Sequence, residues 1–108
     1  GETGLLSGIF RSGSEQNYER ISILYIFMNG TDQPTLNVLI CNYGARNATI
    51  DRVIVDSKFW PSYSPLTVSV GEVTALQIHL DEPLSKNVAH VISLITDRNN
   101  VISAEFRV

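Results

Sequence analysis

The sequence predicts an all-β domain, an antiparallel β-sandwich of about seven strands. Three observations lead to this prediction. Between residues 19 and 108 the chain is a series of short apolar runs, each closed by Gly, Asn, Asp or Pro residues that favour turns. Several runs alternate apolar and polar residues, as strands buried on one face do, and none shows the period of about 3.6 residues that marks a helix. Strands of this number and spacing are typical of an immunoglobulin-like sandwich.

Length and composition describe one domain with few charges. The chain has 108 residues, and its 8 Lys and Arg against 11 Asp and Glu give a net charge of -3. This charge argues against a nucleic-acid-binding module, because such modules present a basic surface to phosphates. Charged residues make up only 18% of the chain. We assign residues 1–18 to an N-terminal segment, a candidate remnant of a helix, and residues 19–108 to the sandwich.

The first run, residues 19–28, alternates so that both of its faces are apolar, with Tyr25 and Phe27 on one face and Ile26 and Met28 on the other. One sandwich core covers only one face, so the run is a candidate subunit interface, and its two apolar faces indicate that it does not lie at a bare edge. An upstream segment or a long loop covering the second face is the alternative. The candidate interface residues are Ile21, Ile23, Leu24, Ile26 and Met28.

Two details of the later runs also predict local structure. Cys41 lies within an apolar run and is expected to be a buried structural thiol. In the third run Ile50 is out of phase with Val53, and this slip near Asp51 and Arg52 predicts a β-bulge. The runs after the first are residues 35–43, 48–56, 66–70, 73–80, 88–96 and 101–108.

A loop rich in aromatic residues and proline separates the third and fourth runs. Phe59, Trp60 and Tyr63 lie there beside Pro61 and Pro65. A loop stiffened by proline loses little entropy on binding, so these aromatic residues are candidates for contacting a partner. The alternative is that Phe59 and Trp60 close the open end of the sandwich.

No arrangement of residues predicts catalysis. His79 and His90 lie on separate runs, and no set of ligands has the spacing of a metal site. The acidic residues fall mostly at turns, and there is neither a phosphate-binding loop nor a nucleophile elbow. We therefore expect no enzyme activity, no cofactor and no metal.

Two glycosylation sequons fall in predicted turns. They begin at Asn29, followed by Gly30 and Thr31, and at Asn47, followed by Ala48 and Thr49. A glycosyltransferase reaches an asparagine most easily in an exposed turn. Both asparagines are therefore candidate glycosylation sites of a cell-surface protein.

Near the start of the chain, Leu5, Leu6, Ile9 and Phe10 have the spacing of a short helical stripe. This stripe fits either the end of a longer helix or a short docking segment.

Two stretches resemble archaeal type IV pilin-like proteins. Residues 36–44 contain an Asn-Tyr-Gly turn, and residues 48–56 follow it as a strand of the form Ile-x-x-Val-x-Val-Asp. Residues 91–102 resemble the closing hairpin of that family, in which Thr-x-Arg-Gly-Asn is common. Here Asn99 stands in place of the glycine, which the tolerance of asparagine for the left-handed conformation allows.

The resemblance implies a sandwich carried outside the membrane by an N-terminal helix that this sequence lacks. The family includes adhesion pilins, archaellins and archaellum accessory proteins of the FlaF and FlaG kind, and we favour the accessory proteins, which act as a stator. The implied location is between the membrane and the surface layer. The implied partners are the surface-layer protein, other archaellum components and a second copy of the chain, with no nucleic acid. A subunit of an adhesion pilus and a carbohydrate-binding module that uses Trp60 and Tyr63 are the alternatives.

Overall fold

The computed structural model describes residues 18–59 and 65–108, and these form eight strands and no helix. Each of the predicted runs contains a strand, so the predicted all-β class is confirmed. The added strand, β4, is a two-residue strand before the aromatic loop. The strands are β1 Ile21–Asn29, β2 Thr35–Asn42, β3 Ala48–Val55, β4 Lys58–Phe59, β5 Leu66–Val68, β6 Val73–His79, β7 His90–Thr96 and β8 Val101–Phe106.

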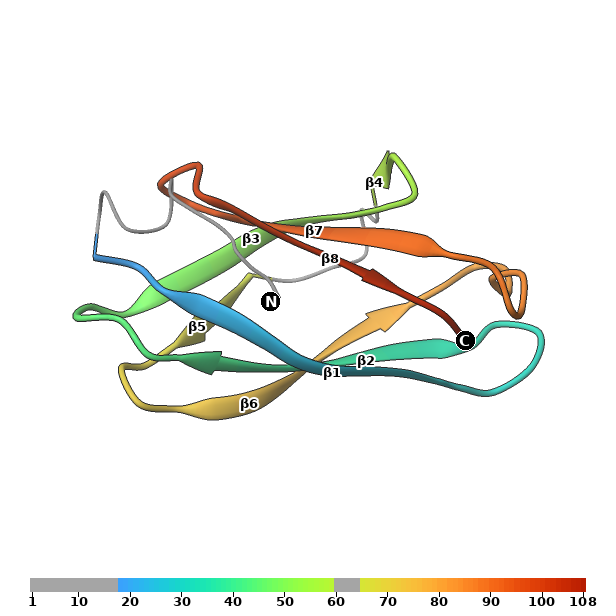
Figure 1. Ribbon diagram of the computed structural model, residues 1–108, viewed down its shortest axis with the longest axis horizontal. Coiled ribbons are helices and arrows are strands. Elements are labelled where there is room, and N and C mark those ends of the chain that lie inside the picture. The colour runs from blue at the N-terminus through green and yellow to red at the C-terminus, as the bar shows by residue number, and fades with distance from the viewer. Residues whose placement is uncertain (1–17, 60–64) are drawn as a thin grey trace.

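The strands form two antiparallel sheets that pack face to face (Figure 1). The first, called the β1 sheet here, has the order β1-β2-β6. The second, the β3 sheet, has the order β4-β3-β7-β8, and β5 pairs with β3 beside this path. Strand β1 starts at one end of the sandwich, and the C-terminus lies at the other end (Figure 1). The described chain therefore leads into the sandwich at the end where the β2–β3 turn and the β7–β8 hairpin lie.

The core fills the space between the sheets with alternate residues of each strand. In β2, for example, Leu36, Val38 and Ile40 are fully buried, whereas Leu39 between them faces outward and is half-buried. The other buried apolar residues are Ile21, Ala48, Ile50, Val53, Val55, Val68, Leu76, Ile78, Leu80, Ile92, Leu94 and Phe106.

The bulge predicted in the third strand is present. The register between β3 and β7 shifts between Ile50 and Arg52, so Ile50 and Val53 both reach the core despite their odd spacing. The conformation predicted for Asn99 is also confirmed, because its φ is 67°. The bulge was predicted from the phase of the apolar residues, and the conformation of Asn99 from its place in the family resemblance.

Several expectations fall on residues that the structure does not describe. These are the helical stripe at Leu5, Leu6, Ile9 and Phe10 and the loop residues Trp60 and Tyr63. The boundary placed between residues 18 and 19 is likewise not tested by the fold. In the part of the chain that the structure describes, no helix has the length and apolar character of a membrane span.

Candidate interaction surface

Strand β1 does not alternate without interruption, and this corrects the face assignment made from sequence. Its register with β2 shifts between Ile23 and Tyr25, which places a bulge at Leu24. The bulge moves the later residues by one position, so Ile26 and Met28 point inward like Ile21 and Ile23 before the bulge. Four of the five candidate interface residues thus pack against the core. Of the five, only Leu24 is exposed.

The bulge brings a different set of apolar residues to the surface of β1. Leu24 is 51% exposed, Tyr25 62% and Phe27 40%. The rings of Tyr25 and Phe27 have centroids 5.7 Å apart, so the two side chains form one aromatic surface. Tyr25 lies opposite Leu39 of β2, and Leu39 lies opposite Ala75 of β6. An apolar band therefore crosses the outer face of the β1 sheet, and we call Leu24, Tyr25, Phe27, Leu39 and Ala75 the outer band.

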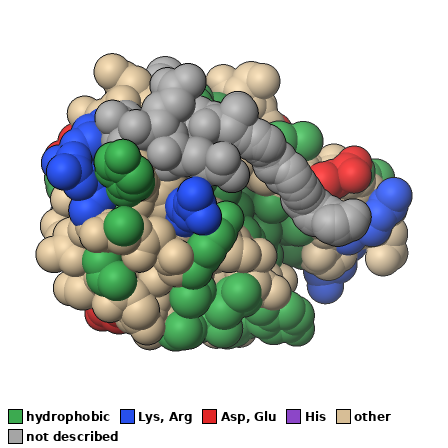
Figure 2. Space-filling view, turned by 60° about the vertical axis from the view of Figure 1, so that its left-hand side comes forward, with side chains coloured by type: hydrophobic (Ala, Val, Ile, Leu, Met, Phe, Trp, Pro, Cys, Tyr) green, Lys and Arg blue, Asp and Glu red, His purple; other side chains and the backbone are tan. Residues whose placement is uncertain are grey.

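The three strands of the β1 sheet contain no Asp, Glu, Lys or Arg. The strands of the β3 sheet contain Asp51, Arg52, Lys58 and Glu105. Natural sheets place charges on outward positions and at edges to prevent association, and the centres of protein interfaces are depleted of charge. Hydrophobic side chains gather on the lower part of the molecule, where the β1 sheet lies (Figure 2).

The outward face of the β3 sheet is built differently. The hydroxyls of Ser93 and Ser103 lie 2.8 Å apart across β7 and β8, and those of Thr49 and Thr67 lie 2.9 Å apart across β3 and β5. Hydroxyl pairs of this kind stabilise a solvated sheet face. The two faces of the sandwich therefore differ in chemistry, and the β1 sheet carries the surface suited to a protein contact.

Strand β1 is an edge strand. It pairs with β2 on one side, and among residues 18–59 and 65–108 no strand pairs with its other side. The expectation that β1 avoids a bare edge is therefore wrong for the described chain. The expectation assumed that both faces of β1 are covered. The core covers the inner face, but the outer face is exposed.

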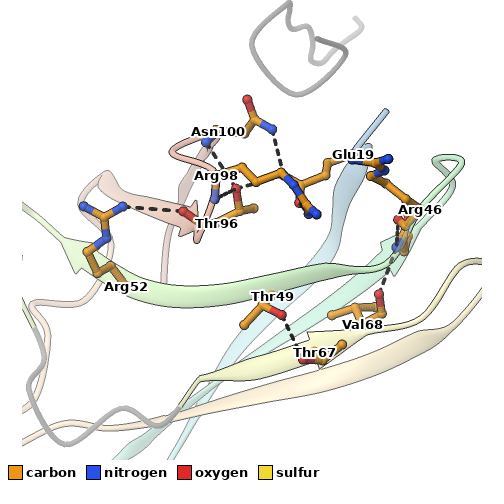
Figure 3. Close-up of polar contacts among 10 residues, drawn as sticks. Glu19, Arg46, Thr49, Arg52, Thr67, Val68, Thr96, Arg98 and Asn100 are labelled. Carbon is orange, nitrogen blue, oxygen red and sulfur yellow. Dashed lines mark hydrogen bonds and ion pairs between the residues drawn. The ribbon is translucent and has the colours of Figure 1, made fainter. Parts of the chain in front are cut away.

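The segment that leads into β1 is held by a buried carboxylate. Glu19 is 0% exposed and accepts hydrogen bonds from the Thr96 hydroxyl at 2.9 Å and the Asn100 side-chain amide at 2.7 Å. Its second oxygen pairs with the Arg98 guanidinium at 2.7 Å. Figure 3 shows these side chains of the β7–β8 hairpin converging on Glu19. A buried charge is stable only when it is paired and hydrogen-bonded, and Glu19 meets both conditions.

The β2–β3 turn holds the same segment from the other side. The Tyr43 amide donates to the Arg20 carbonyl and the Ala45 amide to the Tyr18 carbonyl, both at 2.9 Å. The Asn42 side chain is buried and donates to the Val68 carbonyl at 2.9 Å. Together with the Glu19 contacts, the bonds from Tyr43 and Ala45 fix the lead-in segment, residues 18–20, on both sides.

Both stretches that carry the family resemblance therefore have a common structural role. The Asn-Tyr-Gly turn binds the backbone of residues 18–20, and the alternate residues Thr96, Arg98 and Asn100 bind Glu19. Sequence reasoning missed Glu19, because a glutamate next to a strand is usually solvated. The signal that could have found it is the run of three hydrogen-bond donors at alternate positions of one hairpin.

His90 forms a second buried polar site at the opposite end of the sandwich. Its Nδ1 lies 2.6 Å from the Asp56 carboxylate and its Nε2 lies 2.7 Å from the Ser85 carbonyl. Both partners are acceptors, so this geometry favours the imidazolium form, in which both ring nitrogens donate. The Ser85 carbonyl raises the pKa of His90 most, burial opposes it, and Asp56 raises it further. Burial alone would raise the pKa of Asp56, but the Val91 amide and His90 outweigh it and lower that pKa.

The His90 site predicts a loss of stability as the pH rises above 6.5. Because the folded pKa of His90 is raised above 6.5, its contribution is complete below that pH and is lost as pH rises through the folded pKa. The lowered pKa of Asp56 makes its contribution persist until the pH falls below 3.8. Urea unfolding between about pH 5 and pH 9 should show the free energy of unfolding falling as the pH rises above 6.5. The His90→Phe variant should lose this slope, and a variant that keeps it would show that another group titrates.

The remaining candidate residues are placed as follows. Asn29 and Asn47 are both exposed. Phe59 ends β4, while Trp60 and Tyr63 lie outside the described residues, so their contact with a partner stays a prediction. Cys41 is free and half-buried on the outward side of β2, not fully buried as expected. Across the described residues, no three His, Cys, Asp or Glu side chains group as metal ligands.

Fold and surface together define an immunoglobulin-like β-sandwich that presents an uncharged sheet face. No known protein family and no curated protein matches the chain by sequence. Among solved structures, the chain is similar to the archaellum periplasmic stator protein FlaG from Sulfolobus acidocaldarius, with 16% identity and a TM-score of 0.58 over 82% of this chain and 99% of that one. It is also similar to a chain of the archaellum periplasmic stator protein complex of FlaF and FlaG from the same organism, with 16% identity and a TM-score of 0.56 over 80% of this chain and 87% of that one. At this identity the similarity establishes a shared fold.

Proposed function

We propose that the chain is the external domain of an archaellum accessory protein of the FlaF and FlaG kind, a stator component that works through protein contacts. The observation that carries this proposal is the shared fold, which spans 99% of the FlaG chain. The two stretches that resemble the family support it, because both hold the lead-in segment, residues 18–20. In this proposal the domain lies between the membrane and the surface layer, held there by an N-terminal helix of the full-length protein.

The proposed mode of action is self-association through β1. An uncharged edge strand with exposed aromatic residues offers unpaired backbone groups and apolar area to a second copy of itself. A two-fold interface uses the same surface on both copies, so an antiparallel pairing of β1 with its counterpart brings the outer bands side by side. The resulting assembly would transmit force between archaellum components.

The second proposed contact is with the surface-layer protein, through the loop that contains Phe59, Trp60 and Tyr63. Its basis is the composition of the loop alone. Binding of the natural chain and of the Trp60→Ala variant to isolated surface-layer protein tests this contact. Equal binding by both would remove the loop from the proposal.

Self-association is tested with the Tyr25→Lys variant by light scattering over a concentration series. The natural chain should rise from monomer to dimer mass with concentration. In the variant, two lysines would meet near the two-fold axis, and like charges opposite one another destabilise a strand pair, so we expect monomer mass throughout. The side chain of Tyr25 is exposed, so the domain should remain folded.

Val91→Lys is the matched control, because Val91 is an exposed apolar residue on the outer side of the β3 sheet. This variant should associate like the natural chain. A natural chain that stays monomeric at every concentration, or equal loss of association in both variants, would contradict the role of β1.

A further inference from the structure

We infer that Asn29 is the glycan attachment site of the folded chain and that the first sugar packs on the ring of Phe27. The inference rests on the external location proposed above, because transfer of a preformed glycan to asparagine takes place outside the cytoplasm. It goes beyond the proposed function by separating the two sequons and by giving the glycan a structural contact.

The sequon at Asn29 is open in the folded chain. Asn29 is the last residue of β1 and is exposed, and its side-chain amide makes no hydrogen bond within the described residues. Gly30, with φ of 97°, turns the chain away from the sheet directly after it. Thr31, whose hydroxyl completes the sequon, is exposed in the bend that follows. A transferase that holds all three residues therefore disturbs at most the last pair of β1 with β2, Asn29 opposite Thr35.

The sequon at Asn47 is built into the sheet. The Asn47 side-chain oxygen accepts a hydrogen bond from the Val70 amide at 3.0 Å. Ala48 is 1% exposed in β3, and the Thr49 hydroxyl lies 2.9 Å from that of Thr67. Presenting this sequon to a transferase requires the pairing of β3 with β5 to open. In the folded chain, the sequon at Asn29 is therefore accessible to a transferase and the sequon at Asn47 is not.

Phe27 lies where the first sugar of a glycan on Asn29 would reach it. Residues two apart in a strand share a face, and Phe27 and Asn29 follow the bulge in the same register with β2, opposite Asn37 and Thr35. The Phe27 ring is exposed on the outer face of the β1 sheet. When the apolar C–H face of the sugar packs on the Phe27 side chain, part of the aromatic ring is removed from water. This burial stabilises the folded state.

The transfer itself is a substitution at the anomeric carbon of a lipid-linked glycosyl phosphate. The side-chain nitrogen of Asn29 forms a bond to that carbon, and the bond from the carbon to the phosphate oxygen breaks. The lipid phosphate leaves with the electron pair, and the amide loses one proton to a base of the transferase. No oxidation or reduction occurs, and the chain supplies only the acceptor.

The glycan would also limit how the chain associates. A sugar on Phe27 covers one end of the outer band, so two copies could not stack face to face over that end. The β1 edge, whose backbone groups lie in the plane of the sheet, would remain open. The inference therefore agrees with pairing through the edge.

The test uses the natural protein isolated from its native cells, and separately the purified, folded 108-residue chain treated with an oligosaccharyltransferase and its lipid-linked glycan. Intact mass should show one glycan, lost in Asn29→Gln and Thr31→Val and kept in Thr31→Ser and Asn47→Gln. Modification in both settings supports the inference. An unmodified Asn29 in either setting, or modification of Asn47 in the folded chain, overturns it. The purified reaction does not depend on the archaellum role, so its failure is distinct from failure of the proposed function.

The contact with Phe27 is tested by thermal unfolding of the modified and unmodified forms, each with Phe27 and with Phe27→Ala. The glycan should raise Tm by a few degrees in the natural chain and by less than half as much in Phe27→Ala. Comparison within each variant removes any effect of the substitution on the unmodified fold. An equal rise in both overturns the packing of the sugar on Phe27.

Discussion

Replacing Glu19 by alanine should destabilise the domain by about 3 kcal/mol. The carboxylate is 0% exposed and holds three partners, so its loss leaves the Asn100 amide and the Thr96 hydroxyl buried without an acceptor. It also releases the lead-in segment from the β7–β8 hairpin. Urea unfolding measures the change directly, and Tm should fall by more than about 10 °C.

Two further variants separate the charge of Glu19 from its hydrogen bonds. Glu19→Gln keeps an oxygen for Thr96 and Asn100 but turns an amide toward Arg98, so its loss should be smaller, about 1–2 kcal/mol. Arg46→Ala, at an exposed arginine of the same end, should change stability by less than about 0.5 kcal/mol. If Glu19→Ala costs no more than Arg46→Ala, the carboxylate does not hold the segment.

The second large effect is expected at Gly44, where alanine should cost about 2–4 kcal/mol. A Cβ at this position would lie 2.5 Å from the Tyr18 carbonyl oxygen and 2.6 Å from the Arg20 nitrogen. Both are backbone atoms, so relief requires the lead-in segment to move away from the turn. Movement would break the hydrogen bonds that Tyr43 and Ala45 donate to this segment.

Gly71→Ala is the control for the Gly44 prediction. Gly71 has a φ of 81°, but no atom lies within 4 Å of its added Cβ. Its cost should be only the strain of a left-handed residue, about 1–2 kcal/mol. Denaturant unfolding gives the loss in the free energy of unfolding for both variants. A larger loss in Gly44→Ala than in Gly71→Ala shows that the added Cβ of residue 44 clashes with the lead-in segment, beyond any backbone strain. A Gly44→Ala variant as stable as the natural chain would show that the turn and the lead-in segment do not hold each other.

The strands could be predicted because each needs only local information. Alternation at Leu76, Ile78 and Leu80 identifies a half-buried strand, and the phase slip at Ile50 identifies a bulge, whatever the rest of the chain does. The bulge at Leu24 escaped prediction because every residue from Ile23 to Met28 is apolar, so a shift of one position leaves the pattern unchanged. The candidate interface was consequently drawn on residues that face the core.

The lead-in contacts and the edge position of β1 depend on pairing between distant parts of the chain. Glu19 and Asn100 are 81 residues apart, and nothing near Glu19 indicates which hairpin will cover it. The place of β1 in its sheet likewise follows from topology and not from its own sequence. The lack of charged residues in the strands of the β1 sheet, in contrast, can be read directly from the sequence of those strands.

The proposed archaellum role is tested most directly by the swimming of cells that lack this protein. Deletion of its gene should abolish swimming without slowing growth, and the natural gene should restore it. Restoration should fail with Tyr25→Lys and succeed with Val91→Lys, because only the first alters the exposed surface of β1. Cells that swim normally after the deletion would contradict the account.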